Sequence, residues 1–494
     1  MKRILLIITI LAGCSAMAKA EIYNLTLEQS IEIAKKRSYN MLLLEQDLKI
    51  AEFNLKSATS RLKTHITMGL TTPEYTETIR QWEDSTGISF YSVQQLNYAG
   101  NVTVNQPLPT NGNIYLETGL SSYDDFNTDI RSTSFNTRLR FRQPIDALYG
   151  YNSIKSNLKR AQLNYERSSK SLKRQELNLI YQVTNAYYNL LSLQRRTQIA
   201  SLDLERQTEA NEISKNKFEA GLIREVDALQ MEVDLAEAQN SYDIAIFNEA
   251  SATNSFKELI GIALNDEVTL SSDLKEYKIV AVDPERAVML ALQNRMEIRE
   301  QEIQITLQEL NIKQQKAAGM ISGNLNAYFE KIGVSRQDIN VGYSTTLQNS
   351  FNDLGKRPAN FGIGFSLSIP ILDWGENRAL VRAAQASQKQ NELRKEELQR
   401  EIETEVRNLV ANINNNLKRL QLLEKNVEVA EKSFNITRQR FSDGDIDSQA
   451  LALERNRLNN AYTSHLGAYI NYQLTLADLM RRTFYDFQND VLIQ

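Results

Sequence analysis

The 494-residue chain contains only 19 glycines and 7 prolines, too few for the dense turns of an all-β or a disordered protein. Its 57 basic and 61 acidic residues leave a net charge of -4, which gives no electrostatic reason to expect a nucleic-acid partner. Two histidines and one cysteine offer little for a metal site or for histidine-based catalysis. We therefore expect no catalytic residues, no metal and no cofactor.

The N-terminus reads as a targeting segment. Lys2-Arg3 precede an apolar run from Ile4 to Ala12 that is too short to span a bilayer. Ala18-Lys19-Ala20 fits signal peptidase cleavage, which predicts a signal peptide at 1–20; the competing lipobox that ends at Cys14 would make that cysteine the lipidated first residue. Either form is exported. No later run approaches 18 apolar residues, so a membrane crossing would have to use strands.

Two helical segments start the two halves of the chain. Residues 25–62 carry apolar residues at helical spacing, and a second such segment starts at Asp283-Pro284-Glu285, a favourable helix start. Residues 72–100 show no clear period, and we interpret them as an insertion in the first half.

Four segments alternate apolar and polar residues: 114–120, 135–141, 325–329 and 361–369. The polar stretches 121–132 and 331–360 between them are predicted to be loops. A soluble sheet on a core is one interpretation. Four strands are too few to close a barrel, so a membrane barrel would need several chains, and its lumen would have to take the row Arg138, Arg140 and Arg142.

The longest patterns follow the strands. Apolar and small residues step by three and four for five heptads from Val183 to Phe218, and again from Val406 to Phe441. A helix from Asn152 to Phe218 would be roughly 100 Å long. A dimeric coiled coil would explain the periodicity alone. The two patterns end at Gly221 and Gly444, at an offset of 223 residues, which indicates an internal duplication.

With these motifs, the chain resembles the TolC-like outer membrane efflux protein family. The resemblance is carried by Lys217–Gln230, Val183–Leu191, Ser368–Gly375 and Asn105–Gly112, and it covers nearly the whole mature chain. It implies a mostly α-helical homotrimer in which duplicated long-helix hairpins form a tunnel and four β-strands per chain contribute to a shared outer-membrane barrel. It also implies a periplasmic adaptor protein, an inner-membrane transporter and contact with outer membrane lipid.

The resemblance and the duplication together predict a domain layout. Residues 21–262 form the first repeat, 263–282 an equatorial linker, 283–481 the second repeat and 482–494 a C-terminal equatorial segment. The hairpin tips would dock the adaptor through Gly221, Leu222 and Ile223 in one repeat and through Gly444, Asp445 and Ile446 in the other.

The expected gate departs from the best-known family pattern. The positions of two inward carboxylates in the second repeat are occupied by Ala450 and Leu453. We hypothesise that Asp227, Asp445 and Asp447, with Glu225 nearby, make an acidic mouth instead, because threefold repetition concentrates charge that favours cations. The alternative is that these residues are solvated turn and N-cap residues.

The predicted function is an outer-membrane exit duct of a tripartite efflux or type I secretion system, which conducts substrates passively from the transporter to the outside. The alternative is a periplasmic coiled-coil adaptor or scaffold without a pore, which leaves the alternating strands unexplained. An enzyme is disfavoured, because the chain has no phosphate-binding loop, no metal-ligand spacing and no serine elbow.

Overall fold

The computed structural model describes residues 22–85, 87–145, 147, 150–271, 277–443 and 445–493. The predicted signal peptide, Cys14 and Gly444 therefore lie outside the described residues. The chain divides into two compact units. One contains Met1–Asp47, Ser169–Glu300 and Lys395–Gln494, and the other contains Leu48–Ser168 and Gln301–Arg394.

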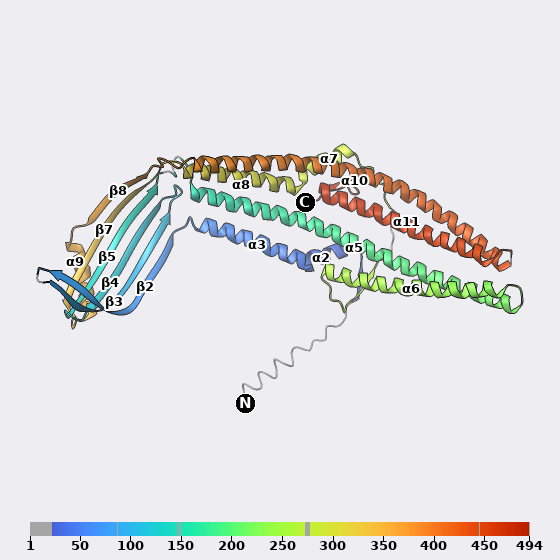
Figure 1. The fold of residues 1–494 in the computed structure, drawn as a ribbon, viewed down its shortest axis with the longest axis horizontal. Helices are drawn as coiled ribbons and strands as arrows, with labels where there is room; N and C mark the ends of the chain where they lie inside the picture. The colour runs from blue at the N-terminus through green and yellow to red at the C-terminus, as the bar shows by residue number, and fades with distance from the viewer. Residues whose placement is uncertain are drawn as a thin grey trace, which may run out of the picture. The chain divides into compact units, whose positions relative to one another are not determined.

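The helices repeat in the same order in both halves of the chain (Figure 1). In the first half they are α2 (Leu27–Arg37), α3 (Tyr39–Ser60), α5 (Ser153–Glu219) and α6 (Glu225–Ile260). In the second half they are α7 (Pro284–Asn294), α8 (Met296–Ala318), α10 (Glu376–Asp443) and α11 (Ser448–Thr483). None of the helices in the described ranges is long and apolar enough to cross a membrane. The equivalent order of elements agrees with the duplication predicted from the sequence.

The helix predicted over 25–62 is broken by one residue, and its counterpart in the second half is broken in the same way. Ser38 and Arg295 have extended ψ angles of 130° and 123°, although each still donates its N–H to a helical carbonyl, that of Ala34 or Ala291. The prediction of a continuous helix is therefore wrong. The sequence did not reveal the break, because the apolar residues on either side of it keep their helical spacing. One residue can redirect a helix without changing that spacing.

The heptad positions of the long helices are buried or half-buried, with one exception. Val183 and Leu190 in α5, and Val406 and Ile413 in α10, have no exposed surface. Phe218, the last position of the first pattern, is 41% exposed, because it lies in the final turn of α5. Burial therefore follows the predicted helix face along its length and is lost where α5 ends.

The main sheet is antiparallel and has six strands in the order β2-β3-β4-β5-β7-β8 (Figure 1). Their bounds are β2 His65–Asp84, β3 Gly87–Pro107, β4 Asn113–Asp125, β5 Ile130–Pro144, β7 Ser322–Asp338 and β8 Asn360–Ser368. The prediction of four strands is wrong. The predicted insertion at 72–100 lies in the β2–β3 hairpin, where a register shift between Thr71 and Glu74 interrupts the alternation.

The two predicted loops are also wrong. Strand β4 continues to Asp125 and β5 begins at Ile130, while β7 continues to Asp338 and is followed by helix α9 (Tyr343–Lys356). These stretches look polar in the sequence because some of their buried side chains are polar. Such side chains can be buried in strands because they form hydrogen bonds with side chains of the neighbouring strand. For example, the hydroxyls of Ser122 and Thr133 lie 2.9 Å apart in a buried hydrogen bond.

Two short strand pairs complete the fold. Strand β1 (Ile22–Leu25) pairs in parallel with β6 (Glu267–Leu270), and β9 (Tyr485–Asp486) pairs with β10 (Val491–Leu492). The buried Tyr472 of α11 donates its hydroxyl to the carbonyl of Lys278 at 2.9 Å. The described parts of the predicted equatorial segments are thus packed against the helices of their own unit.

Candidate functional site

The first hairpin tip turns at Gly221, which has a φ of +74°. The N–H of Leu222 donates to the carbonyl of Lys217 at 2.9 Å, and the N–H of Gly221 donates to that of Phe218 at 2.8 Å. This is the hydrogen-bond pattern of a glycine-terminated helix. Leu222 is 73% exposed and Ile223 is half-buried, so the tip presents apolar surface to its surroundings.

The described part of the second tip follows a similar path. The N–H of Asp445 donates to the carbonyl of Arg440 at 2.9 Å, as expected where a helix has just ended. Ile446 packs on a cluster of buried apolar residues that includes Met231 and Phe434. That cluster draws residues from both hairpins, so the two tips of one chain pack together.

The four predicted acidic residues are held differently. Asp227 accepts two hydrogen bonds from Arg224, at 3.0 and 3.1 Å, and this guanidinium lowers the pKa of its carboxyl group. Asp447 accepts from the N–H of Ala450 at 2.9 Å and caps α11, as the turn-and-cap alternative requires. Glu225 and Asp445 are exposed.

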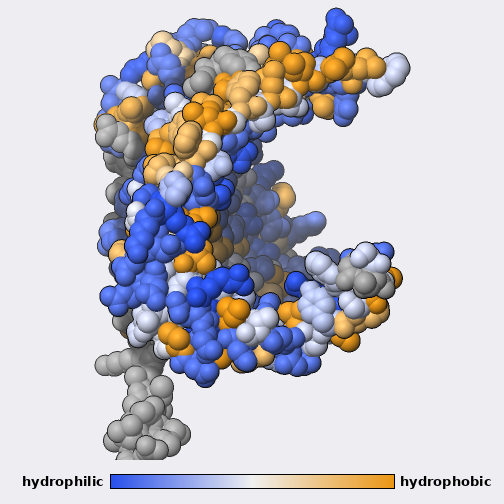
Figure 2. Space-filling view, turned by 90° about the vertical axis from the view of Figure 1, so that its left-hand side faces the viewer, coloured by the Kyte–Doolittle hydropathy of each residue, from blue (hydrophilic) through white to orange (hydrophobic). Residues whose placement is uncertain are grey.

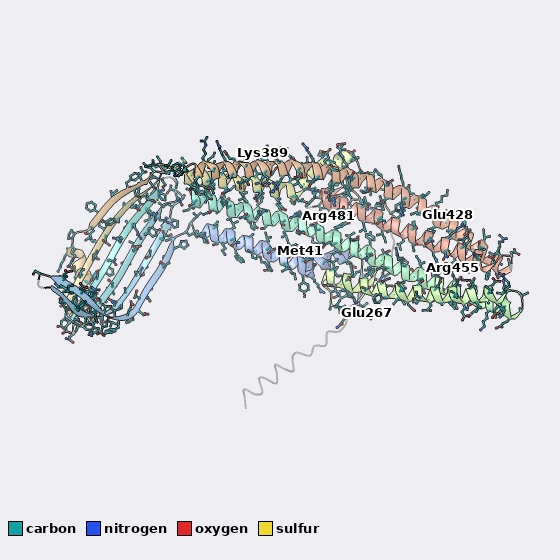
Figure 3. The ribbon with its side chains drawn as sticks, viewed as in Figure 1. Met41, Glu267, Lys389, Glu428, Arg455 and Arg481 are labelled. Carbon is teal, nitrogen blue, oxygen red and sulfur yellow. The ribbon has the colours of Figure 1, made fainter. Side chains whose placement is uncertain are left out.

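An arginine that sequence reasoning missed connects the two hairpins. Arg455 of α11, labelled in Figure 3, donates to the side-chain oxygen of Gln207 in α5, and its Nε lies 3.7 Å from Oδ1 of Asp203. The exposed fractions of the Arg455 and Asp203 side chains are 12% and 16%. A signal was present in the sequence: Arg455 falls on the same helix face as the buried Leu451 and Leu458.

One face of the main sheet is apolar. The strand register places many exposed aliphatic and phenylalanine side chains on this face: Ile66, Met68 and Leu70 of β2, Leu116 of β4, Leu139 of β5, Phe329 of β7, and Phe361, Ile363, Phe365 and Leu367 of β8. Figure 2 shows hydrophobic residues running along the curved sheet. From Phe361 to Leu367 the strand rises about 20 Å, close to the roughly 25 Å height of lipid-facing bands.

The opposite face carries the three predicted arginines. Arg138 forms an ion pair with Glu330 at 3.1 Å, and Arg140 pairs with Glu117 at 2.5 Å. Arg142 donates from Nε to Asn324 at 3.3 Å. The row therefore lies on one face as the alternation predicted, but carboxylates on neighbouring strands offset two of its three charges.

The main sheet has one apolar and one charged face, and its strands connect directly to long helices in a duplicated chain. Together these features define a channel protein of the outer membrane type. The chain belongs to the outer membrane efflux protein family, whose model matches residues 78–261 and 287–483. It is an outer-membrane exit duct of an efflux system.

Solved outer membrane channels share this fold. CmeC of Campylobacter jejuni matches with a TM-score of 0.67 and 14% identity over 95% of this chain and 90% of that one. MtrE of Neisseria gonorrhoeae, in an open state, matches with a TM-score of 0.63 and 17% identity over 95% and 90%. OprN matches with 0.65 and 16% over 92% and 89%. No curated protein sequence gives a significant match.

These comparisons separate the predicted functions. They give no support to the periplasmic adaptor or scaffold, and an outer membrane channel family is not a class of enzymes. Members of the family work with an adaptor and an inner-membrane transporter in efflux systems.

Proposed function

We propose that the chain is a homotrimer whose sheets close a shared membrane barrel and whose helices form a periplasmic tunnel. Strands β2 and β8 are the two edges of the main sheet within the described chain. Edge N–H and C=O groups cannot stay unpaired in hydrocarbon, and the edges of one copy can pair with those of the next. The observation that carries the proposal is this open, two-faced sheet of six strands.

Six strands per chain change the expected size of the barrel. Three copies would supply about eighteen strands, a number at which barrels enclose an aqueous channel. Because barrel diameter grows roughly linearly with strand number, the lumen would be about 1.5 times as wide as that of a barrel built from four strands per chain. Arg138, Arg140 and Arg142 with their partners would line this lumen, which is wide enough for efflux substrates or for polypeptides in type I secretion.

The hairpin tips would be both the docking site and the gate. Exposed Leu222 and half-buried Ile223 support docking of an adaptor protein at Gly221 to Ile223, and we extend this to Gly444, Asp445 and Ile446. Of the acidic residues, Glu225 and Asp445 would carry most of the charge of the mouth. Asp227 shares its charge with Arg224, and Asp447 uses one carboxylate oxygen to cap α11.

The test is a planar bilayer recording combined with polymer exclusion. The purified oligomer, with its mass measured in detergent, is reconstituted, and neutral polymers of graded size are added to one side at a time. We expect three copies per channel, entry of much larger polymers from the barrel side than from the tip side, and block by divalent cations from the tip side. A monomer, or the absence of channels from folded protein, would refute the proposal.

A further inference from the structure

Beyond its register shift, the β2–β3 hairpin extends past the rest of the main sheet. Strand β4 ends at Asp125, opposite Gln95 of β3, whereas β2 and β3 stay paired as far as Glu83 and Ile88. We call the paired segments 74–83 and 88–97 the arm. A two-stranded ribbon is only marginally stable by itself in water, so the arm is expected to pack against another surface.

Two carboxylates lie on the side of the arm that continues the apolar face of the sheet. Glu77 and Glu83 pair with even-numbered residues of β3, and the even-numbered residues of β3 share a face with Leu70 of β2. Glu77 accepts a hydrogen bond from the side-chain amide of its cross-strand partner at 2.9 Å, but neither carboxylate forms an ion pair within the described chain. Arg80, the one basic residue in the β2 part of the arm, lies on the opposite face. This side of the arm therefore carries uncompensated negative charge.

The other edge of the sheet is shortened. Strand β7 pairs with β8 only as far as Glu330 and Asn360, so residues 331–338 of β7 have no strand beside them on the side away from β5 in the described part of the chain. Helix α9 lies over this stretch, where Asp353 accepts from the N–H of Val334 at 2.8 Å. Past the end of β8, the edge of the sheet thus consists of α9 and the open side of β7.

This shortened edge carries uncompensated positive charge. Lys331 has the same parity as Phe329, so it lies on the apolar side of the sheet, just past the apolar residues. Lys356 is exposed in the last turn of α9. Arg357 beside it pairs with Asp353, but neither lysine forms an ion pair with a described residue of its own chain.

In a closed ring of equivalent copies, the arm and the α9 of the next copy would lie at the same height. The helix-connected ends of the strands would be level, and β8 ends nine residues from its own such end. The tenth residue from that end is Glu74 in β2, where the arm begins, and Lys331 in β7. Strand β2 runs away from the helices and β8 runs towards them, so a junction between them is antiparallel like the rest of the sheet.

We propose that the arm of each copy lies against α9 and the open side of β7 in the next copy, where Glu77 and Glu83 bind Lys331 and Lys356. A second copy is the partner because the two surfaces have opposite charge and because the contact continues the junction between β2 and β8. This contact rests on the proposed function, since it requires the homotrimer. It gives the additional hairpin a role in holding the copies together.

The charge test measures the temperature at which the purified oligomer dissociates in detergent. Lys331→Glu combined with Lys356→Glu would place like charges against the arm and should lower this temperature, more at low salt than at high salt. Adding Glu77→Lys and Glu83→Lys restores the attraction with the signs exchanged and should recover most of the loss. Arg336→Glu is the matched control, because this exposed residue lies on the opposite face of β7 and its reversal should change the temperature little. A quadruple variant no more stable than the double variant would overturn the proposal.

A second measurement locates the arm without changing its charges. A photo-crosslinking residue is placed at Ile79, which is 76% exposed on the same face as Glu77, and is activated in native membranes. We expect a crosslinked dimer in which the partner peptide comes from α9 or β7. A crosslink to lipid, or only within one chain, would overturn the proposal. A conducting trimer without this crosslink would refute the arm contact alone, whereas a monomer would refute the proposed homotrimer.

Discussion

Replacing Arg455 with methionine should loosen the contact between the two hairpins near their tips. The substitution keeps the apolar part of the side chain and removes the guanidinium, which donates to Gln207 and lies near Asp203. If the tip opens by separating α11 from α5, the closed state contains this contact and the open state lacks it. The variant should then open more often than the natural protein.

The magnitude follows from the geometry. Two unit charges 3.7 Å apart interact by about 4.5 kcal/mol at an effective dielectric constant of 20, but desolvation of the pair offsets much of this. A hydrogen bond from a charged group contributes about 1.5–3 kcal/mol. We take a net loss of about 2 kcal/mol, which corresponds to a change of roughly 30-fold in the ratio of open to closed channels.

The assay is open probability in planar bilayers, recorded without divalent cations. Arg457→Met is the matched control two residues further along α11, because its side chain is 63% exposed and pairs with Glu454 in its own helix. Adding Asp203→Asn to Arg455→Met should change opening by less than the sum of the two single effects. Equal opening by the variant and the control would refute the reasoning.

Three further predictions concern α9 and the tips. Gly333→Ala should displace α9 and speed trypsin cleavage after Lys356, an exposed residue held in the last turn of the helix, since the new Cβ would lie 2.0 Å from the Ser350 carbonyl oxygen. Gly364→Ala, with open space around it, should leave the cleavage rate unchanged. Asp447→Ala should destabilise α11 by about 1 kcal/mol in thermal unfolding, whereas Asp447→Asn, which can still cap, should be nearly neutral; equal losses would contradict the capping role. Because Arg224 lowers the pKa of Asp227, this carboxylate stays ionised in the folded protein until the pH falls below the usual aspartate range near 4. The natural protein and Asp227→Asn should therefore differ in cation selectivity by the same amount from pH 7 to pH 5, and the difference should disappear only in stronger acid. Loss of the difference between pH 7 and pH 5 would contradict the prediction.

The candidate site was only partly predictable from the sequence. The positions of Gly221 and of the arginine row followed from local rules, namely the termination of a helix by glycine and the alternation of a strand. The partners of Arg138 and Arg455 did not follow from local rules. The partner of Asp227 could have been found, because Arg224 lies three residues before it, at helical spacing. Glu330 and Gln207 are 192 and 248 residues from the arginines they meet, and no local pattern relates them.

By itself, the sequence determined the duplicated order of elements, the long helices and the face of the sheet on which each alternating residue lies, because these depend on periodicities within a few turns or a few residues. Only the tertiary structure decided the number of strands. The β2–β3 hairpin contains a register shift and pairs mostly with itself towards its tip, so its residues show no single period. The placement of α9 was likewise decided by the fold, because its buried side is polar and is held by hydrogen bonds to β5 and β7, two strands that lie side by side only once the sheet has formed.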